Sequence, residues 1–207
     1  MTYFMRIKEV IVIGMLAVTA TPALADHPDS VRVRSLTYAG SGCPAGSVAG
    51  NVSADAQAFT LLFSSYYAEV GPGVPFREKR KNCQLLIDFD YPRGWSFSIF
   101  TVDVRGYVAL ERGVTGTQQT SFYHQGSANT ATLKTVLSGP RDQNYQIRDT
   151  LPLESQQWSS CADQRAVNLN TQVKLESGFN SNRRGLMTVD SIDGAVTLIY
   201  GVAWRRC

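Results

Sequence analysis

The sequence predicts an all-β protein, an antiparallel β-sandwich or jelly-roll held together by two disulfides. Three observations lead to this fold class. Apolar and polar residues alternate with a period of two in several segments, turn residues separate those segments at short intervals, and helical periodicity is almost absent. The four cysteines are an even number, which is typical of a disulfide-bonded exported protein.

The N-terminal segment has the pattern of a signal peptide. Basic residues precede an apolar run over residues 10–18, and the small-residue sequence that signal peptidase recognises ends at Ala25. The apolar run is shorter than the roughly 20 residues that cross a bilayer. We therefore expect residues 1–25 to be removed and residues 26–207 to form a single β-sandwich domain. This domain is expected to be secreted, to the periplasm or the extracellular medium, without a membrane anchor.

The charge of the expected mature chain is close to zero. The full chain has 20 basic and 17 acidic residues, and residues 1–25 contain two of the basic and one of the acidic ones, which leaves 18 and 16. No stretch concentrates this small excess, and the dense run over residues 77–81 contains its own acid. The composition therefore gives no support to nucleic-acid binding, which depends on clustered positive charge.

The first strongly apolar segment, residues 59–70, fits two structures. Its apolar residues recur at the spacing of a helical stripe, and from Phe59 to Phe63 they also alternate as in a strand. Because a short apolar run cannot be assigned by its period alone, the pattern leaves both structures open.

Residues 83–91 form the next expected strand, and a turn over residues 92–94 leads into a longer strand over residues 95–110. In the longer segment the apolar positions have odd numbers up to Ile99 and even numbers from Phe100. This change of phase predicts a β-bulge near Ile99 or two strands in succession. Further strands are expected over residues 113–123, 131–137 and 145–149.

The clearest alternation lies in residues 166–176. The odd-numbered positions from Val167 to Leu175 take one face and polar residues take the other, which is typical of a sheet with one buried and one solvated side. A short strand over residues 186–192, a turn at Asp193-Gly194 and a last strand over residues 196–204 are expected to follow.

The cysteines, Cys43, Cys83, Cys161 and Cys207, allow three pairings, and their spacing alone does not choose among them. We expect the pairs Cys43–Cys83 and Cys161–Cys207, because each pair then lies within one half of the chain. In the chain-entropy model each bridge would stabilise the fold by about 4 kcal/mol.

Several short motifs occur in an order that resembles a known family. They are Gly40-Ser41-Gly42-Cys43-Pro44-Ala45-Gly46-Ser47, Arg80-Lys81-Asn82-Cys83-Gln84-Leu85, Tyr91-Pro92-Arg93-Gly94-Trp95, Arg105-Gly106-Tyr107 and Trp158-Ser159-Ser160-Cys161. The set resembles an uncharacterised family of secreted proteins of bacteria and filamentous fungi, the domain of unknown function 4360. The resemblance implies export, two disulfides, a β-rich fold and a strand over residues 58–63. It implies no catalytic residues.

Sequence signatures of catalysis are missing from the chain. His124 is the one imidazole expected inside a folded site, where a strand end or turn accounts for it, and no G-x-S-x-G motif occurs. If the four cysteines are oxidised, no thiolate is available as a nucleophile. We therefore expect a protein without catalytic activity.

Three aspartates are the candidate acidic residues. Asp88 and Asp90 lie two apart on one expected strand, so their side chains point the same way at a spacing of about 7 Å. Together with Asp103 they could bind calcium, or serve a glycan-active hydrolase as paired carboxylates. A solvated, polar sheet face is the interpretation that we favour, and we expect no cofactor.

Aromatic residues are the positive signal for binding. Flat rings on the surface of a sandwich suit sugar stacking or a protein interface, and the candidate ligand-binding residues are Trp95, Tyr66, Tyr67 and Tyr107. We therefore expect a non-catalytic secreted protein that binds an extracellular glycan or a protein partner. The alternatives are the hydrolase described above and a secreted inhibitor or structural protein that uses residues 77–82 as a rigid loop.

Overall fold

The computed structural model describes residues 27–178, 182–189 and 198–207, and the expected signal peptide lies outside them. In these residues the helical structure consists of two short 3₁₀-helices, η1 (Phe76–Lys79) and η2 (Leu153–Ser155), and neither could span a membrane. The strands are β1 (Arg32–Ala39), β2 (Val48–Val52), β3 (Ala58–Phe63), β4 (Tyr67–Val70), β5 (Arg80–Asp90), β6 (Trp95–Leu110), β7 (Thr115–His124), β8 (Ala131–Ser138), β9 (Arg141–Thr150), β10 (Val167–Glu176), β11 (Gly185–Thr188) and β12 (Leu198–Arg206).

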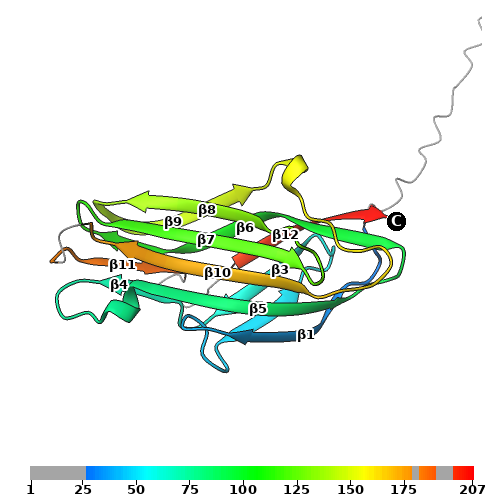
Figure 1. Ribbon diagram of the computed structural model, residues 1–207, viewed down its shortest axis with the longest axis horizontal. Coiled ribbons are helices and arrows are strands. Elements are labelled where there is room, and N and C mark those ends of the chain that lie inside the picture. The colour runs from blue at the N-terminus through cyan, green and yellow to red at the C-terminus, as the bar shows by residue number, and fades with distance from the viewer. Residues whose placement is uncertain (1–26, 179–181, 190–197) are drawn as a thin grey trace, which may run out of the picture.

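The strands form two antiparallel sheets that pack face to face, which confirms the predicted β-sandwich. The first sheet has the order β1-β5-β10-β7-β8 and lies in front in Figure 1. In the second sheet the long strand β6 pairs with β9 along one side and with β12 and β11 along the other. Strands β3 and β2 continue this sheet beyond β12, and β4 continues it beyond β11.

Strand β10 lies at the centre of the first sheet, in register with β5 on one side and β7 on the other. Its odd-numbered side chains, Val167 to Leu175, are buried against the second sheet, and the polar side chains between them face outward. The alternation is regular because one face of the strand packs against the core along its whole length. The strand predicted over residues 166–176 is confirmed.

Strand β6 is continuous from Trp95 to Leu110 and contains the predicted bulge. Gly201 of β12 pairs with Thr101 and Val202 pairs with Ile99, so Phe100 is the extra residue. The bulge shifts the side chains that face the core from odd to even positions, which explains the change of phase in the sequence.

The segment over residues 59–70 forms most of β3 and the whole of β4, so its helical alternative is wrong. In β3 the ring of Phe59 stacks on Tyr200 of β12 with 4.5 Å between centroids, and it also contacts Phe89 of the first sheet. The local apolar period fits both a helix and a strand, so the contacts of Phe59 with two other strands are what select the strand. Strands β1 and β2 were not among the predicted elements, because their residues are largely exposed and carry no continuous apolar pattern.

Both predicted disulfides are present. Cys43 and Cys83 are buried in the core, and their bond ties the connection between β1 and β2 to β5. Cys161 and Cys207 are exposed, and their bond ties the end of the chain to the segment that precedes β10.

The expected loop over residues 77–82 is not present, and the expected turn at Asp193-Gly194 cannot be compared with the structure. Residues 77–82 do not form one protruding loop, because they divide between η1 and the start of β5. The turn expected at Asp193-Gly194 lies outside the described residues, as does part of each strand expected beside it.

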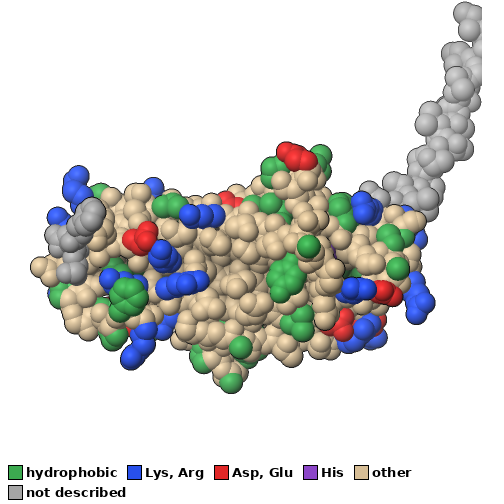
Figure 2. All heavy atoms as spheres, viewed as in Figure 1, with side chains coloured by type: hydrophobic (Ala, Val, Ile, Leu, Met, Phe, Trp, Pro, Cys, Tyr) green, Lys and Arg blue, Asp and Glu red, His purple; other side chains and the backbone are tan. Residues whose placement is uncertain are grey.

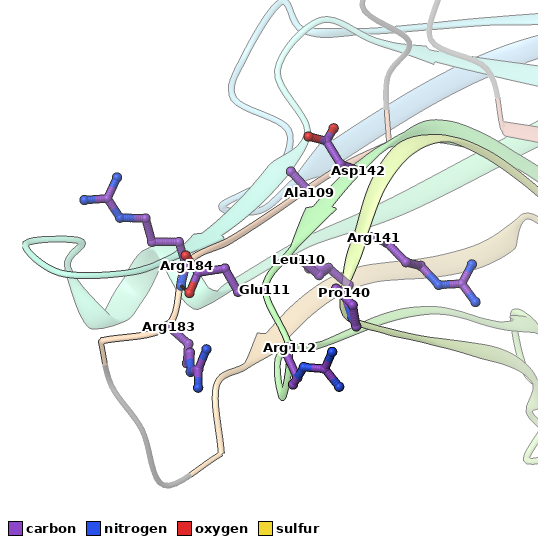
Figure 3. Close-up of a pocket in the computed structure, with 9 residues that line it drawn as sticks. All are labelled: Ala109, Leu110, Glu111, Arg112, Pro140, Arg141, Asp142, Arg183 and Arg184. Carbon is purple, nitrogen blue, oxygen red and sulfur yellow. Dashed lines mark hydrogen bonds between the residues drawn. The ribbon is translucent and has the colours of Figure 1, made fainter.

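At one end of the sandwich, the turn between β6 and β7, the start of β9 and residues 183–184 surround a pocket of about 560 Å³ (Figure 3). Four arginines line this pocket, namely Arg112, Arg141, Arg183 and Arg184. On the outer face of the first sheet, by contrast, charged side chains are sparse in the middle and gather toward the two ends (Figure 2).

Candidate functional site

The three candidate aspartates do not form one site. Asp88 and Asp90 lie on β5 of the first sheet, whereas Asp103 lies on β6 of the second. Among the described residues, no group of three or more histidine, cysteine, aspartate or glutamate side chains is placed to hold a metal ion. The calcium site that the sequence left possible would need all three carboxylates together, and the topology puts Asp103 on the opposite sheet from the other two.

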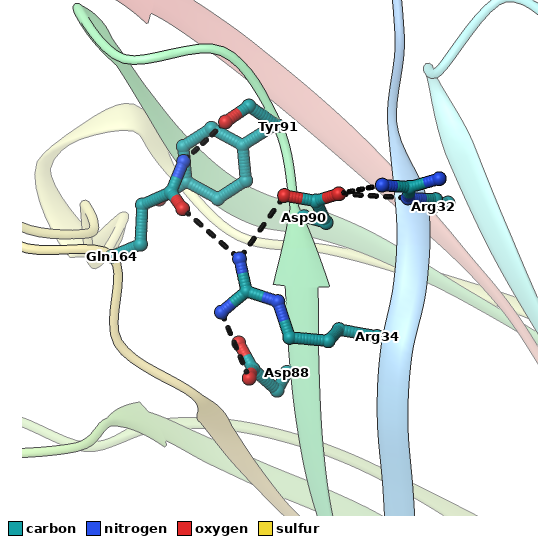
Figure 4. A network of polar contacts seen from close by, with 6 residues as sticks. All are labelled: Arg32, Arg34, Asp88, Asp90, Tyr91 and Gln164. Atoms are coloured by element: carbon teal, nitrogen blue, oxygen red, sulfur yellow. Dashed lines mark hydrogen bonds and ion pairs between the residues drawn. The ribbon is translucent and has the colours of Figure 1, made fainter.

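Arginines of β1 hold the carboxylates of β5 (Figure 4). Arg32 donates to Asp90 at 2.7 Å, and Arg34 bridges Asp90 and Asp88 at 3.0 and 3.3 Å. Hydrogen bonds from Arg32, and secondarily from Arg34, lower the pKa of Asp90. A general acid for glycosidic cleavage needs a raised pKa, so this shift has the wrong direction for that role. The network holds the edge strand β1 against β5.

Asp103 is also paired, although from the other sheet. It lies opposite Arg148 of β9, whose guanidinium donates to both carboxylate oxygens at 2.9 and 3.0 Å. The side chain of Asp103 is nearly buried and that of Arg148 is largely exposed. This bidentate pair links two neighbouring strands of the second sheet.

The four candidate aromatic residues are dispersed through the molecule. Tyr66 lies in the core and donates to Thr171 at 3.4 Å, and Trp95 is covered by the guanidinium of Arg206, 4.0 Å from its ring centroid. Tyr67 and Tyr107 reach the outer face of the second sheet, where β11 separates their strands. The four rings therefore do not form the exposed cluster that we expected from the sequence.

His124 is the last residue of β7 and is only 3% exposed. Its Nε2 donates to the carbonyl of Gln157 at 3.0 Å, and among the described residues its Nδ1 has no hydrogen-bond partner. Burial lowers the pKa of His124, because a proton on Nδ1 would carry a charge into the core without an acceptor. Since its one hydrogen bond goes to a backbone carbonyl, His124 does not form a nucleophile–base pair.

The buried imidazole predicts how stability depends on pH. Because the pKa of His124 is lower in the folded chain than its unfolded value of about 6.5, the unfolded chain binds the additional proton as the pH falls. The free energy of unfolding should therefore decrease below about pH 6.5 and not above it. Urea denaturation at a series of pH values measures this slope. His124→Gln should flatten it, and a variant with the slope of the wild type would assign the effect to another group.

Most of the outward side chains in the middle of the first sheet are polar and uncharged. They form rows that cross the strands, and one row joins Gln84 of β5, Asn170 of β10 and Ser121 of β7. We call this surface the amide face. It comprises Asn82, Gln84, Leu86, Thr117, Gln119, Ser121, Tyr123, Thr132, Asn168, Asn170 and Gln172.

Hydrogen bonds within the amide face hold its side chains in place. Asn170 donates to Gln84 at 3.1 Å, and Ser121 and Thr132 share a hydrogen bond of 2.9 Å. A side-chain amide offers two donors and an acceptor, so each of these groups keeps further capacity toward solvent. The side chain of Asn168 has no hydrogen bond to any described residue. The face therefore presents oriented donors and acceptors whose own side chains are uncharged. Arg80, which donates to Gln172, and Lys134, which lies opposite Gln119, place positive charge at its borders.

Two apolar surfaces lie at one margin of the amide face. Tyr123 of β7 and Leu86 of β5 flank Asn168 of β10 in a single row. Leu86 is 37% exposed and Tyr123 is partly exposed. The sequence predicted one part of this face, because the even-numbered residues of β10 are polar and alternate with apolar ones. It could not show which outward residues of β5 and β7 join that part, because register is decided by strand pairing.

The comparisons with known proteins agree with the motifs in the sequence. A family model described as "Domain of unknown function (DUF4360)" matches residues 29–207. A protein of Arthroderma benhamiae described as an "Uncharacterized secreted protein" is 43% identical over 183 residues, which cover 88% of this chain and 74% of that protein. The resemblance predicted from the ordered motifs is confirmed.

Two solved structures align at low similarity. The structure of TmCBM61 in complex with β-1,4-galactotriose is 9% identical with a TM-score of 0.25, and the alignment covers 84% of this chain and 90% of that one. The enzymatically active domain of bacteriophage CBA120 tailspike protein 4 is 15% identical with a TM-score of 0.24, over 84% of this chain and 19% of that one. TM-scores this low do not show that either structure shares the fold of this chain.

Proposed function

The chain belongs to the DUF4360 family and is secreted, and we propose that it is a non-catalytic protein whose amide face binds an extracellular, uncharged glycan. The observation that carries the proposal is the uncharged field of amides and hydroxyls on β5, β10 and β7, with Tyr123 at its margin. Sugar hydroxyls both donate and accept hydrogen bonds, and so do these side chains.

The shape of the amide face suits an extended ligand. The row from Gln84 to Ser121 spans two interstrand spacings, which is about 10 Å, and neighbouring rows repeat along the strands. A sheet of paired strands is rigid, so its donors and acceptors are ordered before the ligand arrives and binding costs little conformational entropy. Tyr123 adds a rigid amphipathic ring against which the apolar face of a sugar can pack.

A protein partner fits the amide face less well. Protein interfaces derive most of their affinity from buried tryptophan, tyrosine and arginine side chains near their centre. The centre of the amide face carries asparagine and glutamine, and it has no tryptophan or arginine.

Binding to immobilised neutral polysaccharides tests the proposal. We expect the mature protein to be retained by at least one member of a panel of cellulose, chitin, xylan, galactan and β-1,3-glucan. Tyr123→Ala and Asn170→Ala should each weaken the retained complex by about tenfold, the effect of losing one central contact.

The second sheet supplies matched controls. Tyr67→Ala removes an exposed tyrosine from its outer face and Asn144→Ala removes an exposed asparagine, and both variants should bind as the wild type does. Failure of every neutral polysaccharide to retain the protein would refute the proposal. Equal losses for Tyr67→Ala and Tyr123→Ala would refute it as well.

A further inference from the structure

The four arginines at the end of the sandwich come from three separate segments of the chain. Arg112 lies in the turn between β6 and β7, Arg141 begins β9, and Arg183 and Arg184 precede β11. Together they line one pocket of about 560 Å³, and we call this surface the arginine end. The sequence alone does not predict the arginine end, because only Arg183 and Arg184 are neighbours in the chain.

The arginine end keeps a net positive charge, because four arginines and two acids, Glu111 and Asp142, line it. None of its four guanidinium groups forms an ion pair within the described residues, whereas Arg32, Arg34 and Arg148 are all paired with aspartates. Arg141 donates only to the backbone carbonyl of Ser138, at 3.1 Å.

The two acids of the pocket are engaged by other groups. Glu111 accepts from the backbone N–H of Arg184 at 3.1 Å, and Asp142 accepts from the hydroxyl of Tyr107. In Figure 3, Asp142 points away from Arg112 and Arg183. Both carboxylates therefore leave the guanidinium groups available to an outside anion.

The directions of the four arginine side chains favour a polymeric anion over a single small one. In Figure 3, Arg184 and Arg141 extend to opposite sides, and Arg183 and Arg112 turn toward a third side. A single small anion needs donors that converge on it, and these side chains diverge. A polymer with repeated charges can contact diverging guanidinium groups at successive positions, each through paired N–H donors.

We propose that the arginine end is a second binding surface, which takes the carboxylate or sulfate groups of an acidic polysaccharide. This inference goes beyond the proposed function, because it concerns a different surface and a charged ligand. The outer face of the first sheet extends to the same end of the molecule (Figure 1). The planar guanidinium group of arginine can donate two parallel hydrogen bonds to either a carboxylate or a sulfate. Attraction of this kind is screened by salt.

Affinity electrophoresis in gels that contain polygalacturonate or dextran sulfate tests the inference, and the two polymers separate carboxylate from sulfate recognition. The mature wild-type protein should be retarded by at least one of them, and less so as salt is raised. Arg112→Ser/Arg183→Ser should weaken this binding at least tenfold. The control Arg93→Ser/Arg105→Ser removes two exposed arginines elsewhere with the same change of charge, and it should bind as the wild type does.

Two outcomes would overturn the inference. One is equal retardation of the two double variants, which would show that only net charge matters. The other is absence of retardation by both acidic polymers, whether or not the protein binds anionic lipid vesicles. Retention on neutral polysaccharides separates this result from the proposed function, because the Arg112→Ser/Arg183→Ser variant should keep it and Tyr123→Ala should lose it.

Discussion

Gly106→Ala should lower the free energy of unfolding by about 3 kcal/mol, which corresponds to a fall in Tm of roughly 6–12 °C for a chain of this size. A Cβ atom at this position would lie 2.1 Å from the carbonyl oxygen of Thr188 and 2.8 Å from the hydroxyl of Tyr145. Tyr145 donates to that carbonyl at 2.6 Å across the face of Gly106. The added methyl group would therefore displace the backbone of Thr188 and break a partly buried hydrogen bond.

The matched control is Gly50→Ala in the edge strand β2. There the nearest atoms to a new Cβ are methyl carbons of Leu36 and Leu61, at 3.2 and 3.5 Å, and both belong to side chains that can move. We expect this variant to unfold within about 1 kcal/mol of the wild type. Thermal unfolding followed by circular dichroism compares the two variants. A Gly106→Ala protein as stable as Gly50→Ala would contradict the packing described here.

Removing the buried disulfide should cost about 4 kcal/mol or more of stability. Cys43→Ala/Cys83→Ala releases a constraint on a 40-residue separation, which accounts for about 4 kcal/mol in the chain-entropy model. The same change also removes two sulfur atoms from the core, where the cysteines are 1% and 0% exposed. The vacated space adds the cost of a cavity to the loss of the cross-link.

The exposed disulfide provides the comparison. Its cysteines are 46 residues apart, so Cys161→Ala/Cys207→Ala loses nearly the same chain-entropy contribution, but it leaves no cavity in the core. Urea denaturation of both double variants should therefore find the Cys43→Ala/Cys83→Ala protein to be the less stable. The opposite order would show that the core tolerates loss of the buried bond.

The proposed glycan-binding face and the core use the same strands without competing for residues. On β10, Leu169 and Thr171 face the second sheet, and Asn168 and Asn170 face outward on the amide face. A substitution at an outward position removes few core contacts, so changes in binding can be measured on folded protein. Gly106 and the buried disulfide, by contrast, lie inside the sandwich, and their variants report on the fold.

The sequence by itself determined the fold class and most of the strands. It left three disulfide pairings open, and the expected pairs are the ones present in the structure. Alternation over residues 166–176 predicted β10, and the change of phase near Ile99 predicted the bulge in β6, because both patterns follow from neighbours along one strand. The ordered motifs around Cys43 and Cys83 identified the family for a similar reason, since each motif is local in the chain.

Only the tertiary structure decided which side chains meet. Asp88 and Asp103 were candidates for one site, yet they lie on opposite sheets, and Trp95 and Tyr66 were candidates for an exposed cluster, yet they are buried. The amide face and the arginine end depend on the register of β5, β10 and β7 and on which loops gather at one end of the sandwich. These relations join residues that are far apart in the chain, and a periodic pattern carries information only about neighbours within one strand.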